Sequence, residues 1–367
     1  MRIVSVSLES FRNIKGLRTE LSKGINIVYG DNAQGKTNFL EAIYFCALGR
    51  SKRTSDAREL INFGCSEAIV RTVLDREGAS REIDAQIRAE GRGAAKNIAV
   101  DRLPVKKTNE LFGLLLVVVF SPDELRLIKA GPSERRAFMD MELCQISPVY
   151  CHELKCYHHA LKQRNSLLKS ISTGGDGEET LSVWDAQLCK YGRRVTSFRS
   201  DFVKKADAYA SEIHAYLTGG AESLEMRYDP SVAEPDAYEE IIAKNRANDL
   251  RRASTTAGAH KDDIRFMING EDARAYGSQG QQRTAALSAK LAEIEIIKED
   301  AGTDPVLLLD DVLSELDESR QRHLLARMAN LQTVITCTGV EDVLSKKAGA
   351  VDEANVMRMA DGVLLSQ

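Results

Sequence analysis

Long apolar segments are missing from this chain of 367 residues. No uninterrupted apolar run is longer than seven residues, whereas a membrane-spanning helix needs about 20. The first residues alternate between polar and apolar side chains like a strand, and they contain no apolar segment of the kind found in a secretion signal. We therefore expect a cytoplasmic protein that makes no contact with membranes.

Cysteine pairs at redox or metal-binding spacing are missing as well. The chain has seven cysteines, an odd number, and no Cys-x-x-Cys motif, which favours a reducing compartment over a disulfide framework. The spacing of His152, Cys156 and His159 would place all three on one helix face. No fourth ligand accompanies them, so we expect no metal site there.

A strong charge of either sign is also lacking. The 50 basic and 54 acidic residues give a net charge of −4. This value neither indicates nor excludes nucleic-acid binding, because local patches matter more than the total. The length suffices for a large core and for two domains.

A complete phosphate loop is present near the start of the chain. Residues 30–37 have the sequence GDNAQGKT, with an apolar run typical of a buried strand before them and a helical pattern after them. This order aims backbone N–H groups and a helix N-terminus at phosphates. We expect Lys36 to reach the β- and γ-phosphates and Thr37 to bind Mg²⁺. The expected nucleotide-binding residues of the loop are Gly30, Asp31, Asn32, Ala33, Gln34, Gly35, Lys36 and Thr37.

The second half of the chain supplies a matching acidic strand end. Residues 306–309 are apolar and are followed by Asp310 and Asp311. A buried strand that ends in a carboxylate beside a phosphate loop is what a Walker B segment requires. We expect Asp310 to hold Mg²⁺ and Asp311 to orient the attacking water. Lys36, Asp310 and Asp311 are therefore the expected catalytic residues.

Helical periodicity interrupts the strand pattern in the middle of the chain. Residues 133–171 and 182–217 are predicted to be helices, separated by a glycine-containing break, and the second carries a heptad-like apolar seam. Strand patterns precede and follow this region, and the run at 114–120 is predicted to be a central strand. We predict a head formed by residues 1–132 and 254–367, and an inserted antiparallel helical arm at 133–253.

A second phosphate-binding segment precedes the acidic strand. Residues 276–284 have the sequence YGSQGQQRT and open a helical stretch; they resemble the signature of ABC ATPases, and residues 314–317 resemble the D-loop. Ser278, Gln279, Gly280 and Gln281 would meet a γ-phosphate at a helix N-terminus. In ABC ATPases that phosphate is bound to the other subunit. The resemblance therefore implies a head-to-head homodimer with two ATP molecules at its interface.

The whole chain resembles the RecF family, bacterial recombination mediators with an SMC-like ATPase head. The resemblance rests on the order of residues 11–13 (FRN), 30–37, 120–123 (FSPD), 131–136 (GPSERR), 258–263 (GAHKDD), 276–284 and 306–311. It implies an α/β fold: an ABC-type P-loop ATPase head with an inserted coiled-coil-like arm. It further implies ATP and Mg²⁺ as cofactors, an ATP-dependent homodimer, and a position of Arg12 near the nucleotide. The implied partners are double-stranded, single-stranded and gapped DNA together with RecR and RecO-type mediators, in recombinase loading, replication restart and the SOS response.

Three positions depart from the pattern of transporter ATPases. Asp311 replaces the usual glutamate, the next strand ends in Thr336-Cys337-Thr338 without the switch histidine, and residues 121–124 carry acids where the Q-loop glutamine is expected. We therefore expect slow hydrolysis, below the enzyme median of about 10 s⁻¹.

Basic clusters give candidate DNA contacts. The cluster that we expect to face DNA lies beyond the phosphate-loop helix and comprises Arg50, Lys52, Arg53 and Arg58. The basic residues of the arm are more typical of a solvated helix face. His260 is compatible with an exposed loop or with a nucleotide- or DNA-facing position.

Three other functions remain open at this point. The first is an ABC transporter-type ATPase subunit, which the inserted arm and the wording of residues 277–281 disfavour. The second is a small-molecule P-loop kinase, which the signature-like segment disfavours. The third is a chromosome-compacting SMC protein, for which the arm is too short.

Overall fold

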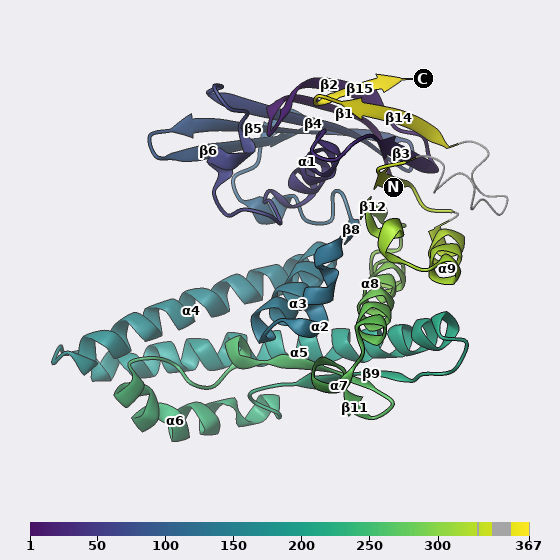
Figure 1. Ribbon diagram of the computed structural model, residues 1–367. Coiled ribbons are helices and arrows are strands. Elements are labelled where there is room, and N and C mark those ends of the chain that lie inside the picture. The colour runs from purple at the N-terminus through teal and green to yellow at the C-terminus, as the bar shows by residue number, and fades with distance from the viewer. Residues whose placement is uncertain (329, 340–353, 367) are drawn as a thin grey trace. The chain divides into compact units, whose positions relative to one another are not determined.

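The computed structural model describes residues 1–328, 330–339 and 354–366 (Figure 1). They form two compact units. Unit 1 contains the described residues of Met1–Asp123 and Ile297–Gln367, and unit 2 is Glu124–Ile296. Within the described residues, no helix is long and apolar enough to cross a membrane.

The unit boundaries differ from those that we placed at 132/133 and 253/254. Residues 254–296 belong to unit 2 because β10 (Asp263–Ile268) pairs along its length with β9 (Leu224–Asp229). Arg135 also binds Asp263 through two hydrogen bonds of 2.6 and 3.0 Å. Strand patterns after residue 253 therefore do not all mark a return to unit 1.

An antiparallel sheet forms one layer of unit 1, in the order β2-β1-β4-β5-β6-β7. Its strands are β1 (Arg2–Phe11), β2 (Ile14–Glu20), β4 (Glu67–Arg76), β5 (Ala79–Glu90), β6 (Gly93–Val100) and β7 (Leu103–Pro104). Burial alternates along β4 and β5, as expected for strands with one face on the core and one in solvent.

A mostly parallel sheet forms the second layer, in the order β15-β14-β3-β13-β12-β8. Its strands are β3 (Ile25–Tyr29), β8 (Val117–Phe120), β12 (Val306–Asp310), β13 (Thr333–Cys337), β14 (Asn355–Ala360) and β15 (Val363–Ser366). The prediction of a central strand at 114–120 is wrong, because β8 ends the order and pairs only with β12 among the described strands. An apolar run indicates buried faces, and it does not indicate a place in the strand order.

Helix α1 (Lys36–Leu48) contacts strands of both sheets. Eleven of its thirteen residues are buried, which explains why apolar residues dominate the part of the helix after Asn38. Shorter elements complete unit 1: η1 (Ala57–Leu60), η2 (Thr108–Glu110), η6 (Val312–Glu315) and α9 (Glu318–Met328).

Unit 2 is built around two long helices that lie side by side (Figure 1). α4 (Pro148–Ser172) and α5 (Glu178–Leu217) run antiparallel, since Glu153 binds Arg194 and Arg164 binds Asp185. The helix predicted at 133–171 is divided into α3 (Pro132–Ile146) and α4, because Ser147 caps α4 and Pro148 has no N–H to donate.

Smaller elements complete unit 2. They are η3 (Pro122–Leu125) at its boundary, α2 (Arg126–Lys129), η4 (Pro235–Ala237), α6 (Tyr238–Arg252), η5 (Ala259–Lys261), β11 (Glu271–Asp272), α7 (Ala273–Tyr276) and α8 (Gln279–Ala301), whose last residues belong to unit 1. Gly192 of α5 allows α6 to approach closely, because a Cβ atom there would lie 2.5 Å from the Tyr238 ring.

Candidate nucleotide site

At two positions of the phosphate loop, the backbone adopts a conformation that only glycine tolerates. Gly30 has a φ of +154°, and a Cβ atom on it would lie 2.2 Å from the Met359 carbonyl oxygen. Gly35 has a φ of +111°, and its Cβ atom would lie 2.8 Å from Asn13 Oδ1. The loop is therefore held tightly by β14 and by the turn after β1, and both glycines are required for its path.

Lys36 lies inside the loop and is buried. Its Nζ atom donates to the carbonyl oxygens of Gly30 at 2.6 Å and Asp31 at 2.8 Å. The loop thus folds around the ammonium group and fixes its charge at the start of α1, where the helix dipole also favours an anion.

The Walker B carboxylate meets the phosphate loop directly. β12 and β3 both flank β13 in the parallel sheet, so their carboxyl ends lie at one edge. Asp310 Oδ1 accepts hydrogen bonds from Thr37 Oγ1 and Thr336 Oγ1, each at 2.8 Å. The structure therefore brings together Thr37 and Asp310, which are 273 residues apart in the chain.

Sequence reasoning missed Thr336. Its hydroxyl also lies 3.1 Å from the backbone nitrogen of Asp311, whose φ is +53°. The residue thus shapes the turn that presents both acids. The sequence signal that could have indicated Thr336 is the polar end of β13, the strand that pairs with β12.

Arg12 contacts helix α1 through the buried carboxylate of Glu41. Its guanidinium donates to both oxygens of Glu41, at 3.0 and 2.8 Å. Ser51 and Arg53 donate to the same carboxylate, at 2.5 and 3.2 Å. The structure shows Arg12 as part of the support of α1, and a contact of Arg12 with nucleotide stays a prediction.

A cavity of about 270 Å³ opens beside Thr37 and Asp310 within unit 1. Its other lining residues include Glu41, Lys52 and Arg53. Two of the four predicted DNA contacts therefore line the hollow next to the expected metal site. Of the other two, Arg50 is exposed, and Arg58 donates to the Gly91 carbonyl at the surface.

The signature-like segment is the start of α8 in unit 2. Ser278 Oγ accepts from the Gln281 backbone nitrogen at 3.2 Å, and the Ser278 backbone nitrogen donates to Gln281 Oε1 at 2.8 Å. This reciprocal pair is a capping box. A Cβ atom on Gly280 would meet nothing closer than 4.0 Å, so the outer side of the turn is open.

The motifs at 131–136 and 258–263 meet one another in unit 2. Arg136 donates to the Asp262 carbonyl at 2.8 Å, and the Asp262 carboxylate is fully buried. His260 is held by Tyr157 at 2.7 Å and by the Thr255 carbonyl at 3.0 Å, so both ring nitrogens have partners. Burial lowers the pKa of His260 to about 4. These contacts assign the histidine to the internal support of unit 2.

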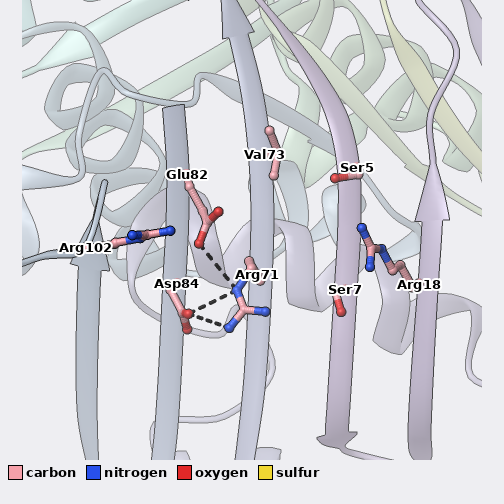
Figure 2. A pocket seen from close by; sticks show the side chains of 8 residues that line it. All are labelled: Ser5, Ser7, Arg18, Arg71, Val73, Glu82, Asp84 and Arg102. Carbon is pink, nitrogen blue, oxygen red and sulfur yellow. Dashed lines mark hydrogen bonds and ion pairs between the residues drawn. The ribbon is translucent and has the colours of Figure 1, made fainter. Parts of the chain in front are cut away.

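A second hollow, of about 480 Å³, lies on the solvent face of the antiparallel sheet (Figure 2). Its lining residues are Ser5, Ser7, Arg18, Arg71, Val73, Glu82, Asp84 and Arg102. Arg71 binds Asp84 at 2.8 Å, and this hydrogen bond raises the pKa of Arg71. The lining has mixed charge, so it lacks the uniformly basic character that a phosphate backbone requires.

Comparison with known proteins shows to which class of protein this fold belongs. The family model described as "RecF/RecN/SMC N terminal domain" matches residues 2–361. The head domain of Smc from Pyrococcus furiosus has the same fold, with a TM-score of 0.57 at 17% identity over 100% of this chain and 96% of that one. With a phosphate loop and a Walker B strand in place, the fold is that of an SMC-like, ABC-type ATPase.

Closer relatives narrow the class. The "DNA replication and repair protein RecF" of Agathobacter rectalis is 46% identical over 95% of both chains, and that of Lachnospira eligens is 44% identical over the full length of both. The structure titled "recombination mediator protein RecF-ATP in RecFOR pathway" aligns with a TM-score of 0.90 at 36% identity, over 100% of this chain and 97% of that one. The chain belongs to the RecF family of DNA replication and repair proteins. This assignment favours DNA repair over a transporter subunit or a small-molecule kinase.

Proposed function

We propose that the protein is an ATP-gated DNA-binding dimer of recombinational repair that hydrolyses ATP slowly. The observation that carries the proposal is the hydrogen bond between Thr37 and Asp310, because it joins the phosphate loop to the Walker B strand. The ATP-bound relative and the family assignment support the nucleotide, and the family's repair role supports DNA as the partner.

Each part of the site has its own proposed role in binding or hydrolysing ATP. Lys36 and the loop backbone hold the β- and γ-phosphates, and Asp311 orients the attacking water. Ser278, Gln279, Gly280 and Gln281 close the site of the partner subunit through the N-terminus of α8. ATP thus joins two heads, the closed dimer grips DNA near gaps and junctions, and hydrolysis reopens it.

Magnesium fits the donor set of the site. The Thr37 hydroxyl and the Asp310 carboxylate are oxygen ligands of the kind that Mg²⁺ prefers, and they lie 2.8 Å apart. When bound, the ion neutralises charge that develops on the phosphates.

Family membership also supplies the proposed partners. The relatives belong by name to the RecFOR pathway, so we propose RecR and RecO-type mediators as partners, with single-stranded, double-stranded and gapped DNA as substrates. The proposed compartment is the cytoplasm, where a bacterial chromosome is repaired.

Hydrolysis in the presence of different DNAs tests this function. We expect a basal kcat below about 10 s⁻¹, with stimulation by duplex or gapped duplex DNA. Lys36→Arg should abolish both rates, because arginine cannot replace the compact ammonium inside the loop. A rate that no DNA changes, or a high rate with ATP alone, would contradict the proposal.

Charge reversal tests the DNA contacts. Arg50→Glu with Arg58→Glu is expected to weaken binding to all duplex sequences and to reduce the salt dependence of log K by about 1 per lost phosphate contact. Lys204→Glu on α5 is the matched control, since Lys204 is exposed and lies in unit 2. Equal affinity and salt slope in both proteins would refute the assignment.

Lys52 and Arg53 need a separate variant, because they line the cavity beside Thr37. If they face DNA, Lys52→Glu with Arg53→Glu lowers DNA affinity while ATP affinity of the monomer is kept. A loss confined to ATP affinity would assign both residues to the nucleotide site.

A further inference from the structure

A chain of polar contacts runs from the signature turn into the interior of unit 2. Gln281 Oε1 accepts a hydrogen bond from the Ser278 backbone nitrogen, and Gln281 Nε2 donates one to Glu222 Oε1 at 3.0 Å. Glu222 lies between α5 and β9, 59 residues before Gln281 in the chain. This second contact fixes which way the Gln281 amide points, because a flipped amide would bring its oxygen against the carboxylate.

His214 lies beside the other carboxylate oxygen of Glu222. The side chain is fully buried near the C-terminal end of α5, and its Nε2 atom lies 3.3 Å from Glu222 Oε2. Its Nδ1 atom lies 3.3 Å from Ser288 Oγ, whose proton is donated to the Thr284 carbonyl at 2.8 Å. The His214 ring thus lies between the Glu222 carboxylate and the Ser288 hydroxyl.

Glu222 thus has the buried His214 ring beside one carboxylate oxygen, while its other oxygen accepts from Gln281 and places that side chain. Because the Ser278 oxygen only accepts within the capping box, its own proton stays available for a phosphate oxygen.

From these contacts we infer that Glu222 and His214 are positioning residues for the signature turn. They preset Ser278 and Gln281 in the geometry that receives the γ-phosphate bound to the partner subunit. The inference rests on the proposed function, in which the start of α8 closes the partner's site. Neither residue touches the nucleotide itself.

Glu222→Ala tests this inference, with Glu225→Ala as the matched control. Glu225 lies three residues further along and pairs only with Arg227 on its own strand among the described residues. Without nucleotide, we expect the amides of residues 276–284 to exchange hydrogen about tenfold faster in Glu222→Ala than in the control, because a hydrogen bond to a charged group is lost. Equal exchange in the two variants would overturn the inference.

Dimerisation and kinetics separate positioning from general stability. We expect Glu222→Ala to raise the dissociation constant of the ATP-dependent dimer about tenfold and to lower kcat, while the ATP affinity of the monomer and KM stay unchanged. Glu222→Gln should restore most of the loss, because its amide oxygen can still accept from Gln281. If Glu222→Gln behaves like Glu222→Ala, the inference is wrong.

Gln281→Met provides a second variant if Glu222→Ala folds poorly. The double variant should lose no more dimer affinity than either single change, because both break one chain of contacts. Additive losses would contradict the inference. A wild-type protein that does not dimerise with ATP would instead refute the proposed function, and amide exchange would still decide whether Glu222 orders the turn.

Discussion

Asp310→Asn is expected to hydrolyse ATP at least about 100-fold more slowly than the wild-type protein, since preorganised charge at a reacting phosphate is usually the largest catalytic contribution. Asparagine keeps an oxygen that can accept from Thr37 and Thr336, so the local fold should survive. What it removes is the negative charge that holds Mg²⁺ next to the γ-phosphate. The measurement is kcat at saturating ATP and magnesium.

Two further variants serve as comparisons for Asp310→Asn. Thr336→Val removes one of the two hydrogen bonds to the carboxylate but keeps its charge, so a loss of about tenfold is expected. Asp304→Asn changes an exposed acid that lies 3.8 Å from Lys298 and should leave kcat unchanged. An Asp310→Asn enzyme within threefold of wild type would show that the Walker B carboxylate is not at Asp310.

Arg199→Ala is expected to lower the free energy of unfolding by about 3–5 kcal/mol, which is typical when one partner of a buried ion pair is removed. The Arg199 side chain is buried and binds Asp140 at 2.7 Å and Asp262 at 3.0 Å. Burial raises the pKa of Asp262, whereas Arg199 opposes that rise. Without the guanidinium, Asp262 is left as a buried carboxylate whose cation is missing.

Thermal or urea unfolding measures this loss. At about 2–4 °C per kcal/mol for a domain of this size, the midpoint should fall by roughly 10 °C. Arg227→Ala is the matched control, because Arg227 is exposed and binds only Glu225 among the described residues, and its change should stay within about 0.5 kcal/mol. Equal midpoints for the two variants would show that Arg199 does not tie α3, α5 and the segment after α6 together.

The strands that flank the site could be predicted from sequence. The apolar run before the phosphate loop is β3, and the apolar residues 306–309 lie in β12, because an uninterrupted apolar run is a direct signature of a buried strand. The predicted α/β class with an inserted pair of antiparallel helices is confirmed as well, because helical periodicity separates the helices from the strand patterns on either side. Glycine spacing also located the phosphate loop, since few other residues accept its backbone.

Pairings between distant segments could not be predicted. The contact between Arg12 and Glu41 depends on how α1 packs beside the end of β1, and that between Thr336 and Asp310 depends on which strands become neighbours. One sequence carries no signal for either. Strand β9 and helix α6 were missed because their burial comes from packing against α5, as at Gly192 and Tyr238. His260 shows the converse: a polar cluster that suggested a ligand is an internal support.

The affinity for gapped duplex DNA with and without ATP tests the central proposal most directly. If ATP closes two heads into a clamp, the affinity of the wild-type protein should rise at least about tenfold with ATP, and Lys36→Arg should show no such rise. An affinity that is the same with and without ATP would contradict an ATP-gated clamp.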